Sequence, residues 1–286
     1  MSSSRSGRMA AAPMAALSLA VVVALATGVT RLALQPPSRE TSWARCEDPS
    51  PDMAIRGCSA VIESGREMAA TLARAYANRC HAFRLKGEYD EALGDCSTAI
   101  NLNPSRAAAF ISRGSLHFAR DEHDRAIRDF DQAIRLDPSD AATFYSRALA
   151  HAARGQTDRA ILDYSEAIRL RPAHADAWNN RCWSRAILGE LEAALGDCEE
   201  AVRLQPDSSV PRDSRGFVHL KAGRLEAAIA DYDASLRLDP RNAWSLYGRG
   251  MARRRNGDAA GAAADIAAAK KIQSDIAEEF ARYGVL

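Results

Sequence analysis

A repeat of 34 residues is the feature of this sequence that most restricts how the chain can fold. Arginine and aspartate each recur at this interval through most of the chain. The arginines are Arg79, Arg113, Arg147, Arg181, Arg215 and Arg249. The aspartates are Asp95, Asp129, Asp163, Asp197, Asp231 and Asp265. Periods of this length are typical of solenoids, in which each unit packs mainly against its two neighbours.

Each unit is predicted to form two helices joined by a tight turn. In the unit 141–174, the first helix is expected to end before Gly155, because glycine accepts the conformation that commonly closes a helix. The second helix is expected over about residues 158–170, with an acid at its start, a base near its end and Pro172 beyond it. Only 6% of the residues are aromatic and alanine is abundant, which favours closely packed helices over sheets.

These units resemble tetratricopeptide repeats (TPR). The shared features are an aromatic residue near the start of a unit, the turn glycine, a pair of alanines in the second helix and a closing proline. In this sequence they are Tyr76, Phe110, Phe144 and Trp178, then Gly155, then Ala160 and Ala167, then Pro104, Pro138, Pro172, Pro206 and Pro240. The resemblance covers residues 73–274 and implies an all-α fold, a right-handed α-solenoid of about six helix-turn-helix units whose first helices line a concave groove. The sequence departs from the family pattern where arginine replaces a common leucine in the first helix, and in the alanine-rich second helix of the sixth unit.

The repeat pattern divides the chain into five predicted parts. Residues 1–26 are predicted to be a signal peptide or a membrane anchor, 27–42 a linker, and 43–72 an N-terminal half-repeat that caps the array. Residues 73–274 form the TPR array, with units starting at 73, 107, 141, 175, 209 and 243. Residues 275–286 are predicted to form a C-terminal capping helix, because an open solenoid end would expose apolar surface.

The N-terminus has the pattern of an export signal. Arg5 and Arg8 precede the apolar stretch 9–29, which contains a small-x-small site at 24–26. Two interpretations remain open: cleavage after Ala26, or an inner-membrane tether through residues 9–29, which are long enough to span a bilayer. Either one predicts repeats outside the cytoplasm of a bacterial-type envelope, periplasmic or secreted in the first case and membrane-anchored in the second.

The arginines and aspartates of the repeat are predicted to form structural ion pairs. They lie sixteen residues apart in every unit, one on each antiparallel helix, so that folding the hairpin brings them level. Each arginine therefore has its own carboxylate. This favours a pair that fixes the helix register over a ladder of arginines that binds an external anion.

The six cysteines are predicted to form three disulfides. Two of the pairs occupy the same two positions of their units, where other units hold a small and a large residue such as Ala148 and Tyr164. The cysteines thus replace one packing contact as a pair. The predicted pairs are Cys46–Cys58, Cys80–Cys96 and Cys182–Cys198. Disulfides persist in oxidising compartments, which agrees with the export signal.

No catalytic constellation is evident, so the protein is not expected to be an enzyme. His117, His151 and His219 share one repeat position and are interpreted as core or interface residues rather than bases. The motifs of zinc proteases, serine hydrolases and P-loop enzymes do not occur. No cysteine–histidine spacing predicts a metal site, and no cofactor is expected. A net charge of +1 gives no basic field for nucleic acid.

The predicted binding surface is the inner face of the first helices, which by family register is apolar and partly aromatic with basic groups toward both ends. Its predicted residues are Ile111, Phe118, Tyr145, Leu149, Asn179, Trp183, Ile187, Phe217, Leu220, Tyr247 and Met251. Co-chaperone TPR domains hold a terminal carboxylate with Lys and Asn at several of these positions. Here Ala77, Ile111 and Tyr145 stand instead, so an extended apolar peptide or an amphipathic helix is the better ligand.

These observations predict a non-enzymatic TPR scaffold that binds a protein or peptide partner in its concave groove, outside the cytoplasm. Two alternatives stay open. One is a self-assembling structural protein of the cell envelope, which would form a homo-oligomer through its solenoid ends or its groove. The other is a cytosolic TPR adaptor.

Overall fold

A computed structural model of the protein describes residues 37–285, and within that range every regular element is a helix. The predicted signal peptide or anchor (1–26) and the first part of the predicted linker lie outside the described residues. In the part of the chain that the structure describes, no helix is long and apolar enough to cross a membrane.

Six helical hairpins form the body of the molecule and confirm the predicted all-α TPR solenoid. The hairpins are α4 (Ala69–Lys86) with α5 (Tyr89–Leu102), α6 (Ala107–Ala119) with α7 (His123–Leu136), α8 (Ala141–Ala153) with α9 (Thr157–Leu170), α10 (Ala175–Leu188) with α11 (Leu191–Leu204), α12 (Ser209–Lys221) with α13 (Leu225–Leu238), and α14 (Ala243–Arg255) with α15 (Ala259–Ile272). Two helices precede them, α2 (Arg39–Cys46) and α3 (Pro51–Glu63), and α16 (Ile276–Arg282) follows them.

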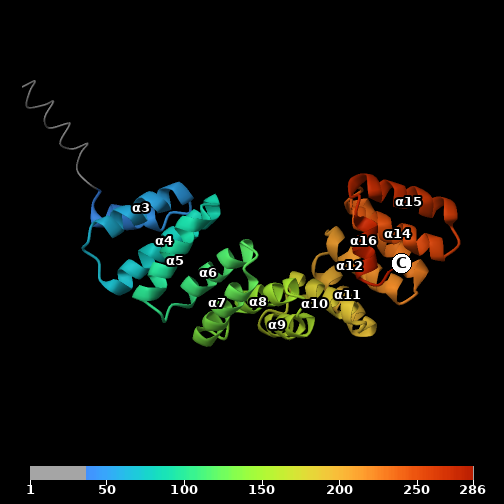
Figure 1. The fold of residues 1–286 in the computed structure, drawn as a ribbon, viewed down its shortest axis with the longest axis horizontal. Coiled ribbons are helices and arrows are strands. Elements are labelled where there is room, and N and C mark those ends of the chain that lie inside the picture. The colour runs from blue at the N-terminus through green and yellow to red at the C-terminus, as the bar shows by residue number, and fades with distance from the viewer. Residues whose placement is uncertain (1–36, 286) are drawn as a thin grey trace, which may run out of the picture.

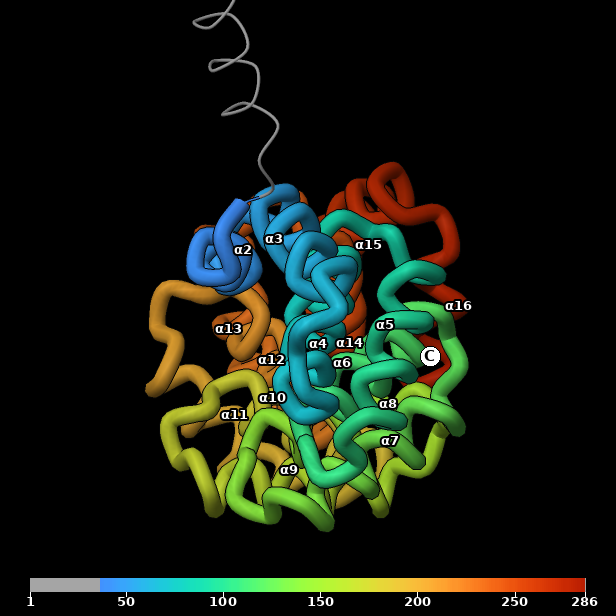
Figure 2. Tube along the Cα trace, turned by 90° about the vertical axis from the view of Figure 1, so that its left-hand side faces the viewer, coloured from blue at the N-terminus to red at the C-terminus, as the bar shows by residue number. Residues whose placement is uncertain are grey.

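The hairpins stack into a curved array with one concave side. The pairs at the two ends rise on the same side of the view, whereas α7, α9 and α11 lie along the opposite side (Figure 1). The perpendicular view shows the same relation, with α3 and α15 at the top and α9 and α11 at the bottom (Figure 2). First helices of successive hairpins touch one another, as α10 and α12 do, while the second helices of the described hairpins are spread apart. The first helices therefore form the inner face.

A residue in the left-handed conformation closes the first helix of every hairpin. Five of the six are glycines with φ between 70° and 93°: Gly87, Gly155, Gly189, Gly223 and Gly257. The second hairpin has Asp121 instead, with φ 58°. Its side chain is 95% exposed and lies 3.9 Å from His123, so it gains little from this surface contact.

We predict that Asp121→Gly raises the free energy of unfolding by about 0.5–1 kcal/mol, because glycine removes the steric cost of a side chain at this φ. Part of this gain is offset, since glycine loses more conformational entropy than aspartate when the chain folds. Urea denaturation followed by circular dichroism measures the difference. The reverse change at the equivalent turn, Gly155→Asp, is the matched control and should lower stability. A lower stability of the Asp121→Gly variant would show that the aspartate side chain supports this turn.

Four of the six hairpins are packed across their two helices by one small residue against one large residue. A Cβ atom added at Gly114 would lie only 2.8 Å from Phe130, and one at Gly216 only 3.0 Å from Tyr232. Disulfides replace this contact in the first and fourth hairpins. These are Cys80–Cys96 and Cys182–Cys198, each with Cα atoms 5.4 Å apart. A third disulfide, Cys46–Cys58, joins α2 to α3.

The disulfide of the fourth hairpin should be replaceable by the glycine and phenylalanine that pack together in the second hairpin. We predict that Cys182→Gly with Cys198→Phe, which copies Gly114 and Phe130, is more stable than Cys182→Gly with Cys198→Ala by about 2–4 kcal/mol, because the alanine leaves a cavity. Both variants lack the disulfide, so thermal unfolding compares the packing alone. Equal stability of the two variants would contradict the equivalence of the disulfide and the small–large contact.

The N-terminal cap is a pair of helices that begins earlier than the predicted half-repeat. The predicted linker covers residues 27–42, but α2 begins at Arg39. Ser38 caps this helix, because its Oγ accepts the backbone N–H of Thr41 at 3.1 Å. Trp43 is buried and donates its indole N–H to Glu67 at 3.1 Å, which fixes α2 against the turn before α4.

Candidate functional site

Each arginine of the 34-residue series lies on a first helix and binds the aspartate of the second helix with two nitrogens. In the third hairpin, Arg147 Nε and Nη2 donate to the two oxygens of Asp163 at 2.8 and 2.7 Å. The other five hairpins have the same bidentate geometry. All six aspartates are buried, between 3% and 7% exposed. Hydrogen bonding to Asp163 raises the pKa of Arg147, so the guanidinium stays charged.

In five of the six units the remaining nitrogen of the arginine, Nη1, donates to the preceding hairpin or, for Arg79, to α3, a contact that the repeat pattern did not predict. Arg147 Nη1 donates to Asp131 at 2.7 Å, and Arg113 Nη1 donates to Ser97 at 3.3 Å. The other acceptors are Ser59 for Arg79, Ser165 for Arg181 and Asp233 for Arg249. The sequence carries a signal for this contact, since a serine or aspartate stands sixteen residues before four of the arginines.

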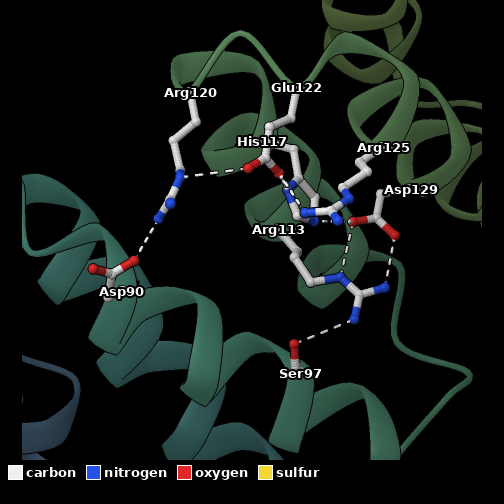
Figure 3. A network of polar contacts seen from close by, with 8 residues as sticks. All are labelled: Asp90, Ser97, Arg113, His117, Arg120, Glu122, Arg125 and Asp129. Carbon is white, nitrogen blue, oxygen red and sulfur yellow. Dashed lines mark hydrogen bonds and ion pairs between the residues drawn. The ribbon is translucent and has the colours of Figure 1, made fainter.

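A second basic group approaches each of several buried aspartates. His117 lies beside Asp129, with Nε2 3.8 Å from Oδ2, and its Nδ1 is 2.7 Å from Glu122 (Figure 3). Arg185 and Arg253 occupy the same repeat position and donate to their own aspartates at 2.7 and 2.8 Å. The other two histidines follow His117: His151 and His219 lie 3.9 and 3.7 Å from Asp163 and Asp231.

These three histidines thus lie beside the arginine–aspartate ion pairs inside their hairpins. Burial lowers the pKa of His219 below its ordinary value, which disfavours its charged form beside Arg215 and Arg224. Among residues 37–285, no three His, Cys, Asp or Glu side chains converge to hold a metal ion.

We predict that Arg147→Lys lowers the free energy of unfolding by about 1–3 kcal/mol, because a lysine ammonium cannot supply the fork to Asp163 and the third bond to Asp131 together. The exposed Arg159 on α9 provides the matched control, and Arg159→Lys should change stability very little. Urea denaturation measures both variants. Unchanged stability of Arg147→Lys would mean that charge alone, without the planar fork, holds the hairpin.

The predicted groove residues fall into an accessible set and a buried set. The accessible set is Ile111, Phe118, Tyr145, Leu149 and Trp183, which are half-buried, and Ile187, which is 36% exposed. The buried set is Asn179, Phe217, Leu220, Tyr247 and Met251. The predicted surface is therefore corrected: the buried five do not face solvent in this structure, and four of them lie in the fifth and sixth hairpins.

The C-terminal helix α16 accounts for much of this burial. Phe280 lies with its ring centroid 5.9 Å from that of Phe217 and 4.8 Å from that of Tyr247. Tyr283 lies 5.2 Å from Trp183, two hairpins back along the chain. The helix therefore covers the inner face of three hairpins rather than the last one alone, and Figure 1 shows it beside α12 and α14.

The inner face of the first three hairpins carries no such helix in the described residues. Ile111, Phe118 and Leu149 are half-buried there, and Leu85 at the N-terminal end is 54% exposed. A shallow cavity of about 430 Å³ opens next to Leu85, between α4 and the loop from α2 to α3, and His81 also lines it. We call this part of the inner face the open half of the groove.

Tyr145 mainly joins two hairpins. Its hydroxyl accepts a hydrogen bond from Asn180 Nδ2 at 3.0 Å, and its ring lies 4.6 Å from His174 and 5.9 Å from Tyr164. Burial raises the pKa of Tyr145. Its contribution to a ligand surface is therefore limited to the ring edge that remains exposed.

Two basic residues at the repeat position of Ile187 cap the ends of preceding helices. Lys221 Nζ donates to the carbonyl of Ala186 at 2.8 Å, and Arg255 Nη1 donates to the carbonyl of Leu220 at 2.9 Å. These carbonyls lie at the C-terminal ends of α10 and α12, where the helix dipole favours a positive charge. Burial lowers the pKa of Lys221.

A half-buried carboxyl group, that of Asp213, lies between the fifth and sixth hairpins. Asp213 accepts a hydrogen bond from Ser245 Oγ at 2.5 Å, and Ser245 Oγ is 2.8 Å from Ser235 Oγ. Burial raises the pKa of Asp213 from 3.8 to about 6. Because the folded protein holds this proton more tightly than the unfolded chain, the stability from Asp213 is complete below pH 3.8 and is lost as the pH rises through about 6.

We predict that Asp213→Asn stabilises the protein relative to the wild type by about 1–2 kcal/mol more at pH 8 than at pH 4, because the neutral amide avoids a charge on a half-buried carboxyl group. Thermal unfolding across this pH range measures the difference. Asp207→Asn, at an exposed site nearby, controls for the change in net charge. A stability difference that does not depend on pH would contradict the raised pKa.

Comparison with known families agrees with this architecture. Models described as tetratricopeptide repeat or TPR repeat match residues 73–106, 114–154, 145–209 and 216–257. Together these matches cover more than half of the chain. The protein therefore belongs to the tetratricopeptide repeat family.

Solved structures of other TPR proteins share the fold. YrrB, described as a TPR protein with an unusual peptide-binding site, is 23% identical, with a TM-score of 0.54 over 65% of this chain and 97% of that chain. PilF from Pseudomonas aeruginosa is 17% identical, with a TM-score of 0.62 over 75% of this chain and 99% of that chain. PilW, described as a widely conserved type IV pilus biogenesis factor, is 16% identical, with a TM-score of 0.63 over 70% of this chain and 93% of that chain. No curated protein sequence shows significant similarity to the chain.

Proposed function

We propose that this protein is a non-enzymatic scaffold that binds a protein or peptide partner in the concave groove of its TPR hairpins, outside the cytoplasm. The observation that carries the proposal is the apolar surface of Ile111, Phe118 and Leu149 on the open half of the groove. These side chains lie on the inner face, where one ligand can contact successive first helices. Peptide binding by a solenoid of this fold is named in the description of YrrB.

The chemistry of the open half favours an apolar ligand. The arginines of the repeat are bound to their own aspartates, so they are not free to hold a ligand carboxylate. Burial of apolar side chains would therefore supply most of the binding free energy. At the N-terminal end, Arg84 lies 3.4 Å from His81, and both side chains would suit a polar or acidic end of the ligand.

The cysteines support a location outside the cytoplasm. All six are paired in disulfides, and such bonds persist in oxidising compartments. The export signal proposed for residues 1–26, or an inner-membrane tether through residues 9–29, would deliver the repeats there. A homo-oligomer that assembles through the groove remains the competing proposal.

Site-specific photocrosslinking tests this function in the cells that naturally make the protein. A crosslinking amino acid replaces Leu149 in the open half, and the same amino acid at Arg159, exposed on α9, is the control. We expect one dominant partner from position 149, none from position 159, and recovery of the crosslinked product in the extracytoplasmic fraction. Crosslinks only between copies of the chain would favour the self-assembling protein. The absence of any crosslinked product at both positions would contradict groove binding.

A further inference from the structure

We infer that α16 acts as an internal ligand, which closes the aromatic half of the groove and is displaced by a partner helix with the same spacing of apolar anchors. The aromatic half is defined by Trp183, Phe217, Trp244 and Tyr247 on α10, α12 and α14. The inference rests on the proposed function, because it names a partner class and a regulation for the same groove.

The anchors of α16 lie on one side of the helix. Ile276, Phe280 and Tyr283 follow one another at i, i+4 and i+7, which is the spacing of a single helical face. Ile276 and Phe280 are fully buried, and Val285 is buried after the turn at Gly284. This arrangement is the same one by which an amphipathic helix of a partner binds in a hydrophobic groove.

The surface under α16 consists of residue types that commonly dominate binding. Trp244 packs against Phe280 with ring centroids 4.6 Å apart, and Trp183 lies 4.6 Å from Phe217 and 5.5 Å from Trp244. These rings come from three first helices and form one contiguous cluster. Without α16 they would form an exposed aromatic patch, which is typical of a site for a protein partner.

The contacts of α16 allow it to open without unfolding the repeats. The helix has seven residues, fewer than a helix needs to be stable by itself in water. In each hairpin a second helix packs along the first, whereas Ala281 and Arg282 on the outer side of α16 are exposed. Only the short connection 273–275 joins it to α15. Undocking therefore breaks the contacts with the groove and with α15 and leaves the six ion pairs in place.

The structure also defines the partner that fits this half. It is a short amphipathic helix with an aliphatic anchor followed by aromatic anchors at i+4 and i+7, and with acids in its first turn. Glu278 and Glu279 supply these acids in α16, where they stabilise the N-terminal end of the helix. The sequence of α16 is therefore a usable probe for the site.

The test uses the full-length protein and a labelled synthetic peptide with the sequence of residues 275–285. In the variant Phe280→Ala with Tyr283→Ala, α16 loses its aromatic anchors and leaves the site open. We expect fluorescence anisotropy to show the peptide binding this variant at least about tenfold more tightly than the wild type, because a docked α16 reduces the fraction of sites that are free. Arg282→Ala, on the exposed side of α16, should bind like the wild type. Adding Trp183→Ala to the open variant should remove the binding.

Several results would overturn the inference. Equal affinity for the wild type and the open variant, or no binding to a folded open variant, would show that α16 is only a structural cap. So would equal binding of a peptide in which the phenylalanine and tyrosine are replaced by alanine.

Hydrogen exchange of the wild-type protein gives an independent measurement if the open variant does not fold. Amides of α16 should exchange at least about tenfold faster than those of α14, by local opening. Exchange of α16 only at the rate of global unfolding would contradict the inference. A partner crosslinked at position 149 together with either negative result would leave the proposed function standing and remove this inference alone.

Discussion

A guanidinium group shared among three helices sets the geometry on which the rest of the molecule depends. Burial of a carboxylate without a partner costs several kcal/mol, and every hairpin buries one. The arginine that neutralises it uses two nitrogens within the hairpin and, in five of the six units, a third on the helices before it, as Arg147 does with Asp131. The same side chain thus fixes the level of two antiparallel helices and ties their hairpin to the helices before it.

The groove that results has two halves with different chemistry. The first three hairpins leave apolar side chains such as Ile111 and Leu149 partly open on the inner face. The last three hairpins collect aromatic rings, and Phe280 of α16 packs on them. A scaffold built in this way can hold one ligand segment in its open half while a second site stays covered. The 34-residue repeat explains why both halves have the same helical backbone. The aromatic side chains and α16, which do not follow the repeat, explain why one half is covered and the other is open.

Much of this architecture follows from the sequence, because the repeat determines local contacts. Residues placed symmetrically about the turn of a hairpin lie level with each other, so the pairing of Arg147 with Asp163 and of Cys182 with Cys198 could be predicted from their positions in the repeat. The burial of Phe217 and Tyr247 could not be predicted, since it depends on the path of α16, which is not part of the repeat. The contact of Tyr283 with Trp183 arises only when three hairpins curve around the same helix. Sequence periodicity identifies the inner face, and tertiary packing decides which part of it is accessible.

The most direct test of this account is a double-mutant cycle across the boundary between two hairpins, on Arg147 and Asp131. The free energies of unfolding of Arg147→Ala, Asp131→Ala and the double variant, measured in urea, give the coupling between the two side chains. Because the guanidinium is held in place by Asp163, we expect a favourable coupling of about 1 kcal/mol and a single cooperative transition in every variant. A coupling below about 0.3 kcal/mol would contradict the account, because the arginine would then act within its own hairpin only.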